Sequence, residues 1–319
     1  MKTHKYPYIL ELHLGCSCRL NCTFCYRNGG TYRNHQMHIC GGTLKKLIVD
    51  FAESGGRELY ISGGLEPFTD YEMVCHSLLL ANKAGLKVRV YTNGAEPILQ
   101  KKWIQELLIC TTAQIRFSVH ARSEKTYSKI TGVQGARAIF TLVKENILSL
   151  LEQKEKTMPK IGISFVVNET NITELIDAAI FWSKFGVDFM DVRFDVLAVD
   201  DQSNKFQSIL NTFQQLVESN AFSPMQVNVG DFKQGKPILP KWCSVPFYKI
   251  VVDRFGLVWP CCLLAQPGSR PSWACLGSLA KQRYPDILRK ISDKFPRRHC
   301  GTCTPFEIKQ NSRLSLSVL

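Results

Sequence analysis

The chain has 319 residues, of which 45% are hydrophobic and 21% charged, a mixture that excludes disordered and fibrous proteins. The formal net charge of +13 favours acidic partners, such as a reductase, a phosphorylated or nucleotide substrate, or nucleic acid. No basic block with interleaved aromatic residues indicates an RNA-binding groove, so we do not expect nucleic acid as a partner. Neither a secretory signal nor an apolar run of about 18 residues is evident, which predicts a cytoplasmic protein without membrane contact.

Strands and helices alternate along the first two thirds of the chain, which predicts βαβ units and a parallel sheet. The six strands are expected at residues 9–14, 58–62, 87–91, 114–119, 160–167 and 188–194. Helical spacing of apolar residues predicts helices at 43–54, 71–84, 97–108, 136–151 and 172–185. The pattern is that of an α/β fold, a partial (β/α)6 barrel similar to a TIM barrel. Functional side chains of such barrels gather where the strands end.

The alternation is expected to stop near Asp195, where a loop-rich segment with several prolines and cysteines begins. We therefore expect a barrel domain at 1–200, a linker at 201–234 and a small cluster-binding domain at 235–319.

Three cysteines follow the first expected strand. Cys18, Cys22 and Cys25 have the spacing C-x3-C-x2-C, so three thiolates come from one short loop. Three thiolates on a [4Fe–4S] cluster leave one iron open to an external ligand. A closed zinc site would instead need four ligands, and Cys16 could supply the fourth.

Together with the aromatic residue Tyr26, this loop resembles the hallmark of the radical S-adenosylmethionine (SAM) superfamily. The resemblance implies that the open iron binds the amino and carboxylate groups of SAM. One electron then cleaves SAM to methionine and a 5′-deoxyadenosyl radical, which removes a hydrogen atom from the substrate. The protein supplies orientation, electrostatics and exclusion of water.

A glycine pair follows the second expected strand. Gly63, Gly64 and Glu66 resemble the Gly-Gly-Glu motif that holds the SAM amino group in this superfamily, with Leu65 inserted. The insertion leaves open whether Glu66 or the loop backbone makes the contact. An ordinary turn would have a similar sequence.

Further candidate contacts lie near the ends of later strands. Asn93 belongs to a Thr-Asn-Gly turn that resembles a family motif, and Ser118 is a candidate SAM contact by the same resemblance. His120 stands where many related members have Asp, and is a candidate for substrate binding or proton transfer. Asn168 and Arg193 are candidate cofactor contacts, although a capping asparagine and an ion-paired arginine explain them equally well.

A second cysteine set occurs near the C-terminus. Cys243, Cys261, Cys300 and Cys303 have a spacing that resembles the SPASM and twitch extensions of radical SAM enzymes. A hairpin is expected at 247–259. The resemblance implies one auxiliary [4Fe–4S] cluster, and a zinc ribbon is the alternative.

Cys262 adjoins an expected cluster ligand. Some radical SAM epimerases return a hydrogen atom to the substrate from such a cysteine, so Cys262 is a candidate hydrogen donor. The expected function is epimerisation or oxidation of a small molecule such as an amino sugar, cyclitol or nucleoside. The alternatives are epimerisation or crosslinking of a ribosomal peptide, modification of RNA, and, remotely, a non-enzymatic zinc-binding module.

Overall fold

The computed structural model describes residues 7–25, 38–154, 158–195, 204–230, 242–266, 272–295, 297–298, 303 and 308. The chain forms two compact units. The first comprises Met1–Cys18, Gly30–Val90 and Pro237–Leu319, and the second Arg19–Gly29 and Tyr91–Lys236. In the part of the chain that is described, no helix has the length and apolar character needed to cross a bilayer.

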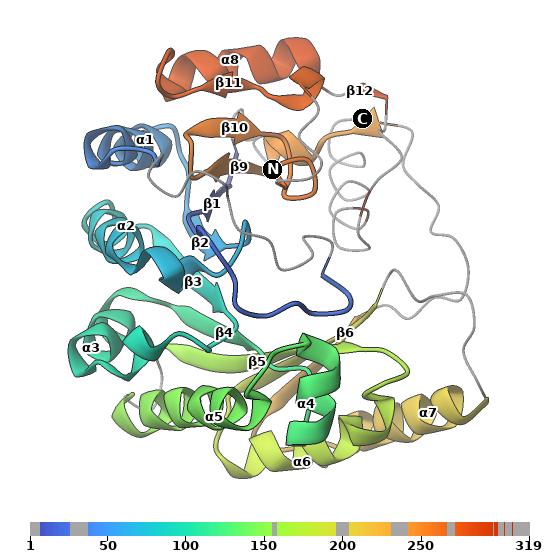
Figure 1. Cartoon of the computed structure of the whole chain (residues 1–319). Helices are drawn as coiled ribbons and strands as arrows, with labels where there is room; N and C mark the ends of the chain where they lie inside the picture. Colours follow the sequence, from blue (N-terminus) through green and yellow to red (C-terminus); the bar gives the residue numbers. More distant parts are fainter. Residues whose placement is uncertain are drawn as a thin grey trace. The chain divides into compact units, whose positions relative to one another are not determined.

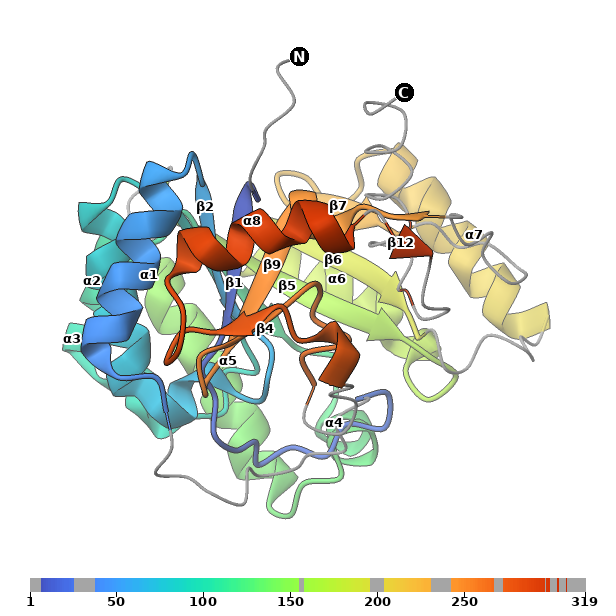
Figure 2. The same ribbon diagram turned by 90° about the horizontal axis from the view of Figure 1, so that it is seen from above.

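The first unit is built on parallel strands whose buried residues are mostly aliphatic. The strands are β1 (Ile9–His13), β2 (Glu58–Ser62) and most of β3 (Lys87–Thr92). They are connected through α1 (Gly41–Glu53), η1 (Pro67–Asp70) and α2 (Tyr71–Lys83). Helix α1 buries an apolar stripe that includes Leu44, Ile48 and Phe51, as expected for a helix that covers a sheet. Helices α1 and α2 lie side by side (Figures 1 and 2).

The C-terminal residues complete this same unit. Strand β9 (Lys249–Asp253) pairs in parallel with β1, and β10 (Leu257–Trp259) and β11 (Gly277–Ser278) continue the sheet antiparallel. The hairpin expected at 247–259 is therefore confirmed. The remaining elements are η4 (Val245–Phe247), η5 (Ser272–Ala274), α8 (Tyr284–Lys294) and a two-stranded ribbon of β8 (Trp242–Cys243) and β12 (Arg297–Arg298).

The second unit has four parallel strands in the order β4 (Gln114–Ser118), β5 (Lys160–Val167), β6 (Phe189–Phe194) and β7 (Gln226–Val229). Its helical elements are η2 (Pro97–Gln100), α3 (Lys102–Thr111), α4 (Glu124–Thr131), α5 (Ala136–Gln153), η3 (Ile172–Glu174), α6 (Leu175–Lys184) and α7 (Asn204–Glu218). Helices α5 and α6 lie along one side of these strands (Figure 1). Burial alternates along β4, so that Ile115 and Phe117 enter the core while Arg116 and Ser118 lie on a more polar face.

The predicted α/β class with a helix-covered parallel sheet is confirmed. All six expected strands are present as β1 to β6, and their ends differ from the expected ones by a single residue at most. The alternation of strands and helices nevertheless continues beyond Asp195. The segment expected as a linker contains α7 and β7, and β7 pairs with β6. The division at residues 200 and 235 stays a prediction.

Candidate active site

The diglycine turn, Gly63 and Gly64, lies directly against the residues that precede Cys18. The backbone N–H of Glu66 donates to the carbonyl oxygen of Ser17 at 3.0 Å. Gly15 approaches the same segment so closely that a Cβ atom on it would lie 2.4 Å from the Glu66 carbonyl oxygen. No side chain fits at this position, which explains the glycine.

Thr69 strengthens this junction from η1. Its hydroxyl oxygen accepts the backbone N–H of Cys16 at 3.0 Å and that of Ser17 at 3.3 Å, and its hydroxyl donates to the Glu66 carbonyl at 2.6 Å. Glu66 is buried, and its carboxylate accepts the N–H of Phe68 at 3.1 Å, which begins η1. The predicted SAM-binding turn and the start of the cysteine loop (residues 16–25) are thus one hydrogen-bonded structure.

In the second unit, residues 19–25 of the cysteine loop are anchored on the C-terminal end of α4. The N–H of Asn21 donates to the carbonyl of Thr131 at 2.7 Å, and that of Thr23 to Ile130 at 2.9 Å. The last carbonyls of a helix have no partner within the helix, so the loop supplies the donors that they lack.

The three predicted ligands, Cys18, Cys22 and Cys25, are half-buried thiols that form no disulfide. The N–H of Cys25 donates to the Cys22 carbonyl at 2.9 Å, which makes the end of the loop a tight turn. Among the described residues, no three His, Cys, Asp or Glu side chains are gathered around one point as ligands of a single ion. In a [4Fe–4S] cluster each thiolate binds a different iron, and three cysteines on one short loop fit such a cluster. Tyr26 lies outside the described residues.

Helix α4 is itself fixed at its start by a carboxylate from η3. Glu174 accepts the N–H of Arg122 at 2.7 Å, the N–H of Ser123 at 3.1 Å, the hydroxyl of Ser123 and the hydroxyl of Thr126 at 2.7 Å. Burial raises the pKa of Glu174, but these hydrogen bonds outweigh it and the pKa is lowered. The carboxylate is therefore ionised and holds α4, which in turn holds the cysteine loop.

His120 lies beside the cysteine loop, with its ring edge-on to Phe24 at a centroid distance of 4.7 Å. Burial lowers the pKa of His120 to about 3, so the ring is neutral at physiological pH. Its Nδ1 accepts the N–H of Val166 at 2.9 Å, and the proton is consequently on Nε2. This arrangement suits an orienting or donating group better than a base, and a role in substrate binding stays a prediction.

The two predicted asparagines shape their own loops. The Oδ1 of Asn93 accepts the N–H of Ala95 at 2.8 Å, and the Oδ1 of Asn168 accepts the N–H of Thr170 at 3.0 Å. Both contacts are turns of the kind that Asn side chains favour. The structure thus gives each asparagine a local role, and their contacts to a cofactor stay predictions.

Ser118 and Arg193 belong to the polar face of the second unit. Ser118 is half-buried at the end of β4, and Arg193 is exposed on β6. Sequence reasoning missed Arg116, which pairs with Asp191 at 2.9 Å and stacks 4.1 Å above the Tyr91 ring. A charged residue at an alternate position of an apolar strand was the available signal.

The second cysteine set belongs to the first unit. Cys243 lies in β8 opposite Arg297 of β12, so it pairs with the strand that ends two residues before Cys300. Cys261 is buried just after β10, and Cys303 is half-buried. Cys300 lies outside the described residues. The strand pairing is consistent with a common site for these cysteines, which stays a prediction.

Cys262 is partly buried and packs against an apolar cluster formed by Val251, Trp259, Ala265 and Ala274. Cys262 therefore lies among apolar side chains, and its role as a hydrogen donor stays a prediction.

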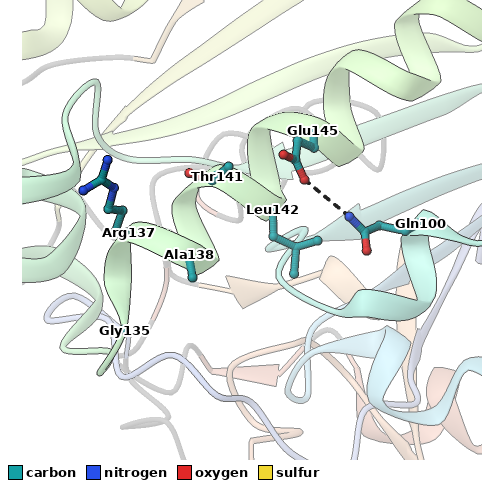
Figure 3. Close-up of a pocket in the computed structure, with 7 residues that line it drawn as sticks. All are labelled: Gln100, Gly135, Arg137, Ala138, Thr141, Leu142 and Glu145. Atoms are coloured by element: carbon teal, nitrogen blue, oxygen red, sulfur yellow. Dashed lines mark hydrogen bonds between the residues drawn. The ribbon is translucent and has the colours of Figure 1, made fainter.

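A separate pocket lies in the second unit on α5 and η2 (Figure 3). It is lined by Gln100, Gly135, Arg137, Ala138, Thr141, Leu142 and Glu145, and the Gln100 amide donates to Glu145 at 3.4 Å. None of the residues singled out from the sequence lines it.

The sequence model described as "Radical SAM superfamily" matches residues 12–145, which include the cysteine loop, the diglycine turn and Asn93. This part of the chain is a radical SAM domain. A radical SAM domain implies a [4Fe–4S] cluster and SAM as cofactors, and the anchored cysteine loop fits this requirement.

Two curated relatives are similar to this chain over part of their length. A dTDP-4-amino-4,6-dideoxy-D-glucose ammonia-lyase of Streptomyces venezuelae is 25% identical over 231 residues, which cover 66% of this chain and 46% of the relative. A probable GTP 3′,8-cyclase of Pyrobaculum aerophilum is 28% identical over 153 residues, which cover 47% of this chain and 44% of the relative. The chain thus spans about half the length of these relatives.

Two solved structures share the fold of this chain. Streptococcus suis SuiB, in a crystal structure with the precursor peptide SuiA, has a TM-score of 0.66 at 16% identity. The match covers 90% of this chain and 66% of the SuiB chain. The protein anSMEcpe with bound AdoMet has a TM-score of 0.63 at 15% identity, and the match covers 95% of this chain and 87% of the anSMEcpe chain.

Proposed function

We propose that this radical SAM protein removes a hydrogen atom from a small molecule such as an amino sugar, cyclitol or nucleoside, which is then epimerised or oxidised. The observation that carries the proposal is the 3.0 Å hydrogen bond between Glu66 and Ser17, since it joins the diglycine turn to the cysteine loop. The amino-sugar class is supported by the similarity to an ammonia-lyase named for a dTDP-amino sugar.

In this proposal Cys18, Cys22 and Cys25 hold the cluster, and the backbone at Gly63 and Gly64 receives the SAM amino group. Bound together, cluster and SAM supply the 5′-deoxyadenosyl radical that abstracts hydrogen. The protein's part is to orient SAM and to keep water from the radical. Because Glu66 already begins η1, the backbone of the turn is the better candidate for the SAM contact.

The auxiliary site is the second part of the proposal. Cys243, Cys261, Cys300 and Cys303 would hold one further [4Fe–4S] cluster, which can accept an electron if the substrate is oxidised. Cys262 would return a hydrogen atom if the substrate is epimerised. The chain's net charge of +13 suits an acidic electron donor such as flavodoxin or ferredoxin.

A ribosomal peptide is the second candidate substrate. It is favoured by the likeness in fold to SuiB, whose crystal structure contains the precursor peptide SuiA, over 90% of this chain.

The test is anaerobic purification followed by iron, sulfide and zinc analysis and a SAM cleavage assay with dithionite. Wild type should hold about eight irons per chain and form 5′-deoxyadenosine. Cys18→Ala should hold about four irons and form none, whereas Cys243→Ala/Cys261→Ala should hold about four and still cleave SAM. Cys110→Ala, at an exposed free thiol of α3, is the control and should match wild type. Zinc in place of iron, with no SAM cleavage, would overturn the proposal.

The substrate class is tested with purified candidates in D2O. Nucleotide-linked amino sugars, cyclitols, nucleosides and peptides are compared for substrate-dependent formation of 5′-deoxyadenosine. Deuterium in the product indicates epimerisation, and a product lighter by two hydrogen atoms indicates oxidation. Turnover of peptides alone would favour the second candidate.

A further inference from the structure

A network of charged side chains is buried inside the first unit, where β1 lies between β2 and β9. The Glu11 carboxylate is at its centre. One oxygen accepts the Ser62 hydroxyl at 2.6 Å and the His13 Nε2–H at 2.9 Å, and the other pairs with the Lys249 ammonium at 2.8 Å. The side chains of His13 and Lys249 are 0% and 7% exposed, so the network is shielded from solvent.

The Glu11 carboxylate is ionised despite its burial. Burial alone raises the pKa of Glu11, but the charge of Lys249, together with the hydrogen bond and charge of His13, lowers the pKa well below its usual range. Apolar residues of similar size often replace a buried ion pair with little loss of stability, because desolvation of two charges largely cancels their attraction. The presence of the ion pair therefore points to a requirement for a defined geometry.

The geometry that this network fixes is that of the diglycine turn. His13 lies directly beneath the turn, since a Cβ on Gly63 would be 2.5 Å from the His13 Nε2, and one on Gly64 would be 2.9 Å from the His13 Cβ. Both glycines have positive φ, +30° and +78°, which other residues rarely adopt. The turn therefore rests on an imidazole ring whose orientation is set by Glu11.

We propose that Glu11, His13 and Lys249 are positioning residues for SAM, because they hold the diglycine turn in the shape that receives the SAM amino group. This inference rests on the proposed function of the turn. It extends that function to three residues that would not touch SAM themselves. The same side chains also connect the turn to the C-terminal part of the chain.

Lys249 begins β9, and the end of β9 closes the hairpin that leads to Cys261. The Asp253 carboxylate accepts the N–H groups of Phe255 at 2.9 Å and Leu257 at 3.0 Å, and the indole N–H of Trp259 at 2.9 Å. Through Lys249 and Glu11, the hairpin that precedes the proposed auxiliary ligands is thus in contact with the SAM turn. A structural change in the hairpin should therefore alter the conformation of the turn.

The test compares Glu11→Gln with Glu58→Gln. Glu58 is a matched control, because it is an equally buried, ion-paired carboxylate on the next strand, where it pairs with Arg89 at 3.0 Å. Amide hydrogen exchange of residues 63–66 is measured in the SAM-free protein, and the Kd for SAM in the cluster-loaded protein. Iron content reports whether each variant has loaded its clusters.

Glu11→Gln should speed exchange of residues 63–66 and weaken SAM binding by about tenfold each, with wild-type iron content. Glu58→Gln should leave both quantities unchanged. If Glu11→Gln does not fold, Glu11→Gln/Lys249→Met replaces it, since the double variant leaves no unpaired buried charge. Unchanged exchange and Kd in whichever variant folds would overturn the inference. If the proposed function is wrong, the wild-type protein will not bind SAM at all. Hydrogen exchange is measured without SAM, so it tests the role of Glu11 in either case.

Discussion

The backbone N–H of Asn21 donates to the carbonyl oxygen of Thr131 at 2.7 Å. This bond fastens the cysteine loop to the last residue of α4, next to Gly132, whose φ of +58° ends the helix. The loop has little regular structure of its own, and the helix end provides the fixed reference for it. Changes at this helix end are therefore expected to alter cluster binding without touching a ligand.

Gly132→Val should lower the iron content of the protein. A β-branched residue at positive φ costs about 1–2 kcal/mol, and a Cβ at this position would already lie 3.4 Å from the Asn21 carbonyl oxygen, so the valine methyl groups would push the loop away. Gly135→Val is the matched control, because Gly135 has a similar φ of +67° but nothing within 4 Å of its Cβ position. Urea denaturation should show similar destabilisation of both variants, whereas iron analysis should show a loss only in Gly132→Val. Equal iron contents would contradict the role of the contact.

His120→Gln should make the stability of the protein less sensitive to acid. In the unfolded chain His120 binds a proton below pH 6.5, whereas burial lowers its pKa to about 3 in the folded protein. The contribution of His120 to the free energy of unfolding is therefore fully present above pH 6.5 and decreases as the pH drops towards 3. Between pH 6.5 and 5 wild type should lose about 2 kcal/mol more than His120→Gln, whose amide oxygen can still accept the Val166 N–H. Parallel losses in urea titrations across this range would show that His120 can be protonated in the folded state.

Glu174→Ala should destabilise the protein by about 2 kcal/mol, because the start of α4 loses its capping carboxylate. Glu169→Ala, at an exposed position of the loop that precedes η3, should have almost no effect. The lowered pKa of Glu174 means that its contribution is present above the unfolded pKa and is lost as the pH falls through the folded one. Urea midpoints at neutral and acidic pH test both statements. A Glu174→Ala midpoint equal to that of Glu169→Ala would refute them.

Cys262→Ala should keep SAM cleavage and hydrogen abstraction but lose incorporation of solvent hydrogen into the product. Cys275→Ala is the control, because Cys275 packs against the same apolar cluster. The measurement is mass spectrometry of product formed in D2O once a substrate is known. An unaltered product from Cys262→Ala would eliminate the epimerase mechanism.

Sequence periodicity was sufficient for the core strands, since β1 to β6 are apolar runs at regular intervals. Helix α4 was missed although it has local end signals: Ser123 caps its start by accepting the N–H of Thr126, and Gly132 ends it in the left-handed conformation. Only the contact of its start with Glu174, some fifty residues away, has no local pattern. Helix α7 could have been found, as Phe206, Leu210 and Phe213 have helical spacing and are buried. The low hydrophobicity of the surrounding residues concealed this signal.

The cysteines of the site were identifiable because cluster ligands have a defined spacing, whereas their supporting residues were not. Glu11 and His13 alternate with leucines in β1, which indicates a polar face of the strand. Their partner Lys249 could not be inferred, because the pairing of β9 with β1 joins segments more than two hundred residues apart.

The pairing of β9 with β1 also bears on how such enzymes diversify. Residues Pro237–Leu319 belong to the same compact unit as the N-terminal strands, with Ile9 opposite Lys249 and His13 opposite Asp253. A C-terminal region transplanted from another family member would have to reproduce this register and supply a cation for Glu11. Without β9, the edge of β1 would be left open to pairing with another chain. New substrate specificities should therefore arise by substitutions within this region more readily than by its wholesale exchange.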